Sequence, residues 1–166
     1  MKVLVTYFSE TGNTEKLAKA VFEAVESSKK EILPVQEVTG IDGYDVIFIG
    51  FPVHSHNVPG KVEALVKKLP EGQKVAYFAT HGSLRGGELA VTAFYHALNL
   101  AKNAVILGTF GCRGKVKQQI IDALMEKLEH RAWAQEAQSA TGHPDEADLE
   151  DARDWVERMI IKARAR

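Results

Sequence analysis

The chain has 166 residues, 45% of them hydrophobic, and a formal net charge of −1 with a pI near 6.6. This length fills one well-packed domain, so we expect residues 1–166 to form a single domain. A nearly neutral charge gives no reason to expect a nucleic acid or an anionic membrane surface as a partner. The single cysteine, Cys112, excludes an internal disulfide framework and permits a reducing cytoplasm, where we expect the protein to be. The N-terminus enters an apolar strand without a signal-peptide pattern, and no apolar run approaches bilayer length, so we expect no membrane insertion.

The first predicted elements are an apolar strand over residues 2–8 and a helix that begins at about Thr14. Between them lies the loop Ser9-Glu10-Thr11-Gly12-Asn13-Thr14. Hydroxyls, a glycine and backbone N–H groups at a helix N-terminus suit a phosphate, because they donate hydrogen bonds at the positive end of the helix dipole. The loop lacks both the Gly-Lys-Ser/Thr ending of a P-loop and the Gly-x-Gly-x-x-Gly of dinucleotide folds. It therefore favours one terminal phosphate held by neutral donors; alternatively, Thr11, Asn13 or Thr14 only caps the helix.

Four further apolar segments predict strands, and segments of helical periodicity separate them. The strands are expected over residues 31–38, 44–50, 73–79 and 103–110, the first of them at a sheet edge because of Pro34. Helices are expected after residue 60, after residue 87, from about residue 116 and from residues 145–148 onward. Strands that alternate with helices predict a doubly wound α/β fold, in which helices cover both faces of a five-stranded parallel sheet.

The unusual polar residues gather in three loops that follow strands, over residues 9–14, 51–60 and 80–87. Open parallel sheets bind ligands beyond the carboxyl ends of their strands, near the point where the strand order reverses. The three loops therefore predict one binding site at that edge of the sheet.

The segment Ser9-x-Thr11-Gly12-Asn13-Thr14 resembles the phosphate loop of the flavodoxin family, and the order of strands and helices is similar over about the whole chain. The resemblance implies a flavodoxin-like three-layer α/β/α fold with strand order 2-1-3-4-5 and a non-covalently bound FMN. The cofactor-binding residues that it implies are Ser9, Glu10, Thr11, Gly12, Asn13 and Thr14 at the phosphate, Pro52, Val53, His54, Ser55, His56 and Asn57 on one side of the flavin ring, and Thr80, His81, Gly82 and Ser83 on the other.

The function that the resemblance implies is electron transfer between redox partner proteins or small electron acceptors. The alternative is an NAD(P)H- or quinone-reactive FMN oxidoreductase of the same fold. A third reading keeps the fold but not the cofactor, as a binding module whose loop holds another anion.

Two features depart from many flavodoxins. The loops beside the expected ring contain no Trp or Tyr, and only Phe51 lies at the end of the preceding strand. The chain is also nearly neutral where many flavodoxins are strongly acidic, and it places histidines near the ring. We therefore predict a less negative potential for the second electron, which rises as the pH falls through histidine ionisation.

Other residues have simpler interpretations. His54 and His56 lack a third ligand at metal-binding spacing, which favours a polar loop beside the flavin. Cys112 follows the expected fifth strand, and a phosphatase loop would need an arginine where Gln118 stands, so we interpret Cys112 as a packed thiol. Trp133 and Trp155 are expected to be structural.

Two segments keep open interpretations. Arg85 with Gly86 and Gly87 is interpreted as a helix N-terminal turn, or else as a contact to a substrate or partner. Residues 116–140 exceed what a short flavodoxin needs, so they could cover the sheet edge, form a dimer contact or roof the flavin site. The oligomeric state stays open.

Overall fold

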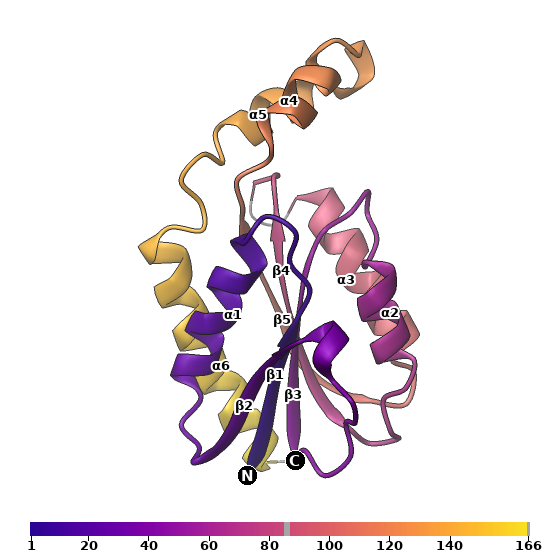
Figure 1. Ribbon diagram of the computed structural model, residues 1–166, viewed down its shortest axis with the longest axis vertical. Coiled ribbons are helices and arrows are strands. Elements are labelled where there is room, and N and C mark those ends of the chain that lie inside the picture. The colour runs from indigo at the N-terminus through magenta and orange to yellow at the C-terminus, as the bar shows by residue number, and fades with distance from the viewer. Residues whose placement is uncertain (85–86, 166) are drawn as a thin grey trace.

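The computed structural model, which describes residues 1–84 and 87–165, contains one five-stranded parallel sheet in the order β2-β1-β3-β4-β5 (Figure 1). The strands are β1 Lys2–Tyr7, β2 Lys29–Pro34, β3 Val46–Pro52, β4 Lys74–His81 and β5 Val105–Arg113. The α-helices are α1 Asn13–Ala24, α2 Gly60–Val66, α3 Glu88–Leu100, α4 Gln118–Met125, α5 Arg131–Gln138 and α6 Glu146–Ala165. The predicted doubly wound topology is confirmed, whereas the turn expected at Arg85 and Gly86 lies outside the described residues.

Helices α1 and α6 cover one face of the sheet, and α2 and α3 cover the other (Figure 1). Alternate residues of the central strands pack into the two layers, since successive side chains of a strand point to opposite faces. Val3 and Val5 of β1 join the core beneath α1 and α6, whereas Leu4 joins the core beneath α2 and α3. Both faces are therefore buried, as the continuous apolar runs of these strands predict.

Several strand boundaries differ from the predictions. The strand expected over residues 31–38 ends at Pro34, and a 3-10 turn, Val35–Glu37, follows it. Strand β4 continues through Thr80 and His81, which the sequence placed in a loop. Strand β5 continues to Arg113, so Cys112 lies within the strand rather than after it, and it is buried.

Residues 116–140 do not form the expected long helix. They form a hairpin of two short helices, α4 and α5, joined through a 3-10 turn at Leu128–His130, and the hairpin projects beyond the carboxyl ends of the strands (Figure 1). Its small core contains Ile121 and Ala134, because the two helices bury their sides against each other. Ile120 and Leu128 stand at helical spacing in the sequence, yet they are 46% and 79% exposed.

Helix α6 returns the chain along the sheet and buries Trp155 against Phe48 and Phe110, with ring centroids 5.6 Å apart in both pairs. Trp155 is therefore structural, as predicted. Among the described residues, no helix combines the length and apolar character that crossing a bilayer requires.

Candidate functional site

The loop between β1 and α1 leaves the first turn of α1 open to a ligand. Gly12, at the N-cap, has a φ of 92°, a left-handed conformation that glycine adopts without a steric penalty. Its amide donates to Ser9 Oγ at 3.1 Å, and the first helical bond runs from the Lys16 amide to the Gly12 carbonyl. The amides of residues 13–15 precede that bond and have no acceptor within the helix. In the described part of the chain no side chain caps α1, which argues against the capping interpretation.

The side chains of this loop bind neighbouring segments instead. Thr14 is buried, and its hydroxyl lies 2.8 Å from the hydroxyl of Thr80 at the end of β4. Asn13 donates from its side-chain amide to the carbonyl oxygen of Lys115 at 2.8 Å. The loop between β1 and α1 is thus fixed to β4 and to the segment that follows β5.

The loop after β3 makes a tight two-residue turn. His54 and Asn57 exchange backbone hydrogen bonds of 3.1 and 2.7 Å, with Ser55 at φ 45° and His56 at φ 71° between them. Positive φ at both central positions is typical of a type I′ turn, and glycine or asparagine adopts it more readily than serine or histidine. Such backbone conformations concentrate at ligand sites. The His54 imidazole also lies 3.5 Å from the Glu10 carboxylate, which joins this turn to the phosphate loop.

The end of β4 contacts the hairpin of α4 and α5. His81 is buried, and its Nδ1 lies 2.9 Å from the carbonyl oxygen of Ser83. Trp133 of α5 donates from Nε1 to Ser83 Oγ at 2.9 Å. A Cβ at Gly82 would lie 2.6 Å from Val116 Cγ2, so only glycine permits this approach. Trp133 is structural, as predicted, and its contact positions the loop after β4.

These loops enclose a cavity of about 130 Å³ at the carboxyl end of the sheet. It brings together ten predicted site residues: Glu10, Thr11, Asn13, Thr14, Pro52, Val53, His54, Thr80, His81 and Gly82. Six predicted residues lie outside its lining: Ser9, Gly12, Ser55, His56, Asn57 and Ser83. Ser83 contacts the lining residue His81 through its carbonyl oxygen, and Ser9 and Gly12 are hydrogen-bonded to each other, whereas Ser55 and His56 form the exposed tip of the turn.

A fourth wall lies outside the predicted site residues, although a roof over the flavin site was one of the alternatives left open for residues 116–140. It consists of Gly114, Lys115, Val116, Lys117 and Ile120. Because β5 extends to Arg113, this segment also follows the carboxyl end of a strand, and that position was the available signal. Two exposed lysines, Lys115 and Lys117, thus stand beside a loop that we expected to act with neutral donors alone.

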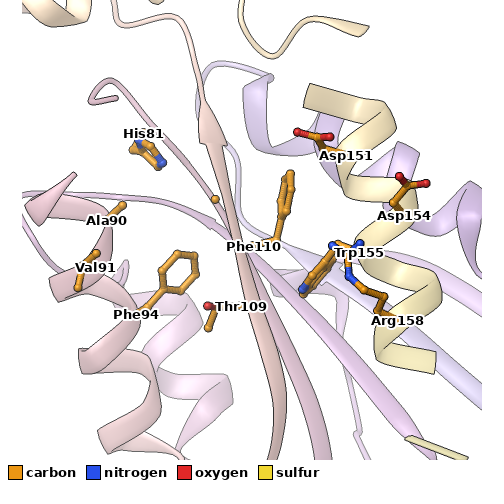
Figure 2. A pocket seen from close by; sticks show the side chains of 11 residues that line it. His81, Ala90, Val91, Phe94, Thr109, Phe110, Asp151, Asp154, Trp155 and Arg158 are labelled. Atoms are coloured by element: carbon orange, nitrogen blue, oxygen red, sulfur yellow. The ribbon is translucent and has the colours of Figure 1, made fainter. Parts of the chain in front are cut away.

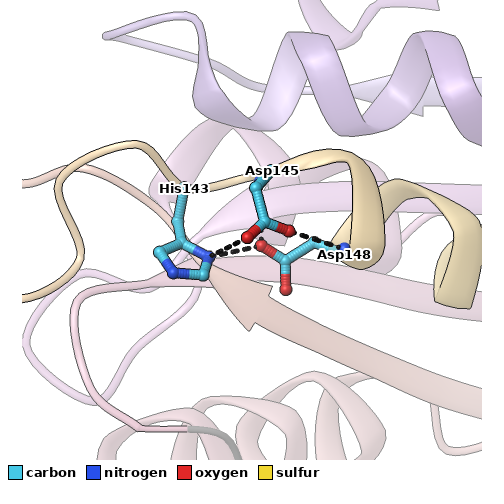
Figure 3. A group of neighbouring side chains, drawn as sticks. All are labelled: His143, Asp145 and Asp148. Atoms are coloured by element: carbon cyan, nitrogen blue, oxygen red, sulfur yellow. Dashed lines mark hydrogen bonds and ion pairs between the residues drawn. The ribbon is translucent and has the colours of Figure 1, made fainter.

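Among the described residues, the group of side chains that could hold a metal ion does not include His54 or His56. His143, Asp145 and Asp148 place their ligand atoms within 4.8 Å of one another (Figure 3). The Asp145 amide donates to Asp148 Oδ2 and the Asp148 amide to Asp145 Oδ1, both at 3.0 Å, while His143 Nδ1 lies 2.6 Å from Asp148 Oδ2. This reciprocal pattern is a capping box at the start of α6. The backbone N–H of Asp148 is the main cause that lowers the pKa of Asp145.

This geometry agrees with the comparisons to known proteins. The sequence matches the flavodoxin domain family over residues 4–157. The chain belongs to the flavodoxin family. It is 31% identical over 175 residues to the flavodoxin-like domain-containing protein BilS of Clostridioides difficile (strain CD3). The alignment covers 98% of each chain.

Solved structures share the flavodoxin fold. A flavodoxin from the domain Archaea superposes with a TM-score of 0.65 and 15% identity, over 99% of both chains. A flavoprotein from Lactobacillus acidophilus NCFM, solved in complex with FMN, superposes with a TM-score of 0.54 and 21% identity, over 66% of this chain and 92% of that one. These likenesses confirm the flavodoxin-like α/β/α architecture.

Proposed function

We propose that this flavodoxin-family protein binds FMN non-covalently and carries electrons between redox partners. The proposal rests on the first turn of α1, which has no side-chain cap. Residues of this turn line the same cavity as the loops after β3 and β4. FMN is the cofactor that the family and the phosphate-binding loop both indicate. Its phosphate fits this loop, because the amides of residues 13–15 and the Thr11 hydroxyl are donors at the positive end of a helix dipole.

The remaining lining residues would hold and shield the flavin ring. The turn at His54 and the loop at Gly82 both line the cavity, and Val53 and Ile120 add apolar side chains to it. The bound flavin supplies one- and two-electron redox chemistry. Lys115 and Lys117 add positive charge at the cavity, which favours a reduced flavin that carries negative charge. This charge supports the predicted less negative potential of the second electron.

A specific observation favours the second candidate, an FMN oxidoreductase that reacts with NAD(P)H or a quinone. The described lining of the cavity contains no Phe, Tyr or Trp. A flavin face without an aromatic cover leaves room for a small substrate. Lys115 and Lys117, which line the cavity, would attract an anionic substrate.

The test is an absorption spectrum of the purified protein, before and after addition of FMN and then of dithionite in steps. Saturable FMN uptake with reduction in two separate one-electron steps supports the electron carrier. Reduction by NAD(P)H without a partner protein supports the enzyme.

Asn13→Asp places a carboxylate beside the phosphate and should weaken FMN binding at least tenfold, whereas Asn99→Asp on the exposed side of α3 should not. A protein that takes up no FMN contradicts the proposal and favours another anion.

The single cysteine of the chain is compatible with a reducing compartment, and we propose the cytoplasm. Electron carriers of this kind act with partner proteins, so pull-down of the FMN-loaded protein from a cytoplasmic extract, with the FMN-free protein as control, would identify candidates.

A further inference from the structure

A groove of about 420 Å³ lies at β5, the last strand in the sheet order, between α3 and α6 (Figure 2). Its lining comes from both layers of the fold. Phe94 of α3 packs against the core beneath α2 and α3, whereas Phe110 and Trp155 belong to the core beneath α1 and α6. The groove therefore extends around the edge of the sheet, where no further strand of the described chain pairs with β5.

The two edges of the sheet differ in composition. Strand β2, at one edge, contains Lys29, Lys30 and Pro34, and lysine and proline discourage association between sheet edges. Strand β5, at the other edge, is nine residues long and contains neither residue type. Its middle residue, Thr109, is exposed. The β5 strand thus lacks the residues by which β2 discourages contact with another molecule.

Exposed apolar side chains stand on both sides of the β5 edge. On α3, Val91 lines the groove and is 41% exposed, and Tyr95, one turn further along the helix, is 63% exposed. On α6, Ile161 is 64% exposed. It lies two turns after Asp154, which lines the groove, so these two residues share one stripe of the helix. Aromatic and aliphatic groups among polar ones are typical of a protein–protein interface.

Two side chains of opposite charge at the groove have no partner. Asp154 and Arg158 stand one turn apart on α6 (Figure 2). Within the described residues, the side chains of Asp154 and Arg158 form neither an ion pair nor a hydrogen bond. Both charges are therefore available to groups outside the chain.

The packing of α6 on β5 sets the position of these two charges along the strand. Lys162 Nζ donates to the carbonyl oxygen of Leu107 at 3.1 Å, and Trp155 packs on Phe110 with ring centroids 5.6 Å apart. Helix α6 therefore runs antiparallel to β5. The midpoint between the two charges, one residue after Trp155, lies beside Phe110 and near the centre of the strand.

A two-fold axis across the middle of β5 makes this surface complementary to itself. In a two-fold contact, residue i of one copy meets residue j of the other, and residue j meets residue i. Because the two charges lie on either side of the centre, Asp154 of each copy then faces Arg158 of the other. The result is two ion pairs, with the apolar groups of α3 and α6 beside them.

We propose that a second copy of this chain binds at the β5 edge as a two-fold dimer, through the side chains of α3 and α6. The strands of the two copies run in opposite directions, so the two flavin sites lie at opposite ends of the dimer and stay open. The dimer does not depend on FMN. It is tested on FMN-free protein, so its failure is distinguishable from failure of the flavin proposal.

Sedimentation velocity of the FMN-free protein over a range of concentrations measures the association, and we expect a reversible equilibrium between monomer and dimer. Asp154→Arg alone and Arg158→Asp alone each place like charges at both contacts, so each should weaken dimerisation at least tenfold. An equimolar mixture of the two variants has opposite charges at both contacts and should form a heterodimer. A folding defect in either variant would not produce this recovery.

Matched variants separate the groove from the rest of the surface. Asp42→Arg makes the same change of charge as Asp154→Arg at an exposed position in the connection before β3, and should leave dimerisation unchanged. Val91→Glu should weaken the dimer at least tenfold, whereas Thr92→Glu, at an exposed position of α3 outside the lining, should not. A chain that stays monomeric at every concentration, charge variants that dimerise like the unmodified protein, or a mixture without recovery would overturn the proposal.

Discussion

Asn13, at the start of α1, donates its side-chain amide hydrogen to the carbonyl oxygen of Lys115, 102 residues further along the chain. The Lys115 amide in turn donates to the carbonyl oxygen of His143, just before α6. Lys16 Nζ donates to the carbonyl oxygen of Pro144 at 2.5 Å. The start of α1 is therefore joined to the segment after β5 and to the segment before α6, and the geometry of the loop before α1 depends on segments remote in sequence.

Replacement of Asn13 tests this connection. Asn13→Ala removes the donor to the Lys115 carbonyl and should lower the free energy of unfolding by about 1 kcal/mol, as expected for one hydrogen bond. It should also weaken FMN binding several-fold, because the loop loses a constraint. Urea unfolding and a flavin fluorescence titration measure the two effects. Asn99→Ala on the exposed side of α3 is the control. Equal midpoints for both variants would show that the connection contributes nothing.

The buried hydroxyl pair of Thr14 and Thr80 allows a double-mutant cycle. Thr14→Val should cost about 1 to 3 kcal/mol, because it leaves the Thr80 hydroxyl buried without a partner. The double variant Thr14→Val with Thr80→Val should recover most of that loss, since neither hydroxyl then remains. Urea unfolding of both single variants and the double variant gives the coupling energy. Additive losses would contradict a direct hydrogen bond.

Local patterns predicted the strands and the three loops at their carboxyl ends, whereas the strand order and the individual site residues came from the resemblance to the flavodoxin family. Uninterrupted apolar runs mark strands that are covered on both faces, and a glycine between hydroxyl residues at a helix start marks an anion-binding turn. The missed wall depends on pairing between strands. Gly111 to Arg113 look like a loop by composition, yet they pair with Ala79 to His81 and extend β5.

The hairpin of α4 and α5 could not be predicted for a similar reason. The spacing of Ile120, Leu124 and Leu128 is typical of one buried helical stripe. The chain turns at Leu128–His130, so the two short helices bury Ile121 against Ala134 and expose Leu128. Periodicity reports which residues share a face of a helix, but not whether the helix continues.

The two lysines beside the flavin site should shift its redox potential. A unit charge about 8 Å away contributes roughly 0.5 kcal/mol in water and about 2 kcal/mol at intermediate dielectric. Replacing Lys115 and Lys117 together with glutamine should therefore make the potential of the second electron about 45 to 180 mV more negative. Potentiometric titration of the FMN-loaded protein measures the shift, which high salt should reduce.

Lys102→Gln supplies the matched control for that measurement. Lys102 is exposed in the connection between α3 and β5, at the amino end of the strands and thus at the opposite end of the sheet from the site. Its removal changes the net charge without changing the site. Lys102→Gln removes one positive charge and the double variant removes two. A shift half as large in Lys102→Gln would therefore mean that net charge, rather than the two lysines at the cavity, sets the potential.

The absence of a side chain at Gly82 should allow the close contact between the loop after β4 and the residues Val116 and Trp133. Gly82→Ala places a Cβ 2.6 Å from Val116 Cγ2 and 3.1 Å from Trp133 Cζ2, so we expect a loss of about 1 to 3 kcal/mol in stability. Val116→Ala in the same chain should restore part of it. Gly40→Ala, where a Cβ meets nothing within 4 Å, is the control. Urea unfolding compares the three variants, and no rescue by Val116→Ala would contradict the contact.

The capping box at the start of α6 should make stability depend on pH in the acidic range. The pKa of Asp145 is lowered from 3.8, chiefly because the Asp148 amide donates to its carboxylate, and the charge of His143 contributes less. A lowered pKa in the folded state means that the stabilisation is present above pH 3.8 and is lost as the pH falls through the folded-state value. Asp145→Asn keeps an acceptor oxygen, so its stability should fall less steeply between about pH 5 and pH 3.

Asp145→Ala removes the cap itself and should lower the free energy of unfolding at pH 7, where Asp145→Asn should lower it less. Asp42→Asn, in an exposed connection remote from α6, is the control for the loss of one negative charge. Urea unfolding midpoints at several pH values between 3 and 7 measure both effects, since acid protonates the carboxylate that accepts the Asp148 amide. If Asp145→Asn and the unmodified protein lost stability in parallel down to pH 3, another carboxylate would be responsible.

Because this cap lies next to the His143 carbonyl oxygen that accepts the Lys115 amide, the same acidification should also weaken FMN binding in the unmodified protein more than in Asp145→Asn.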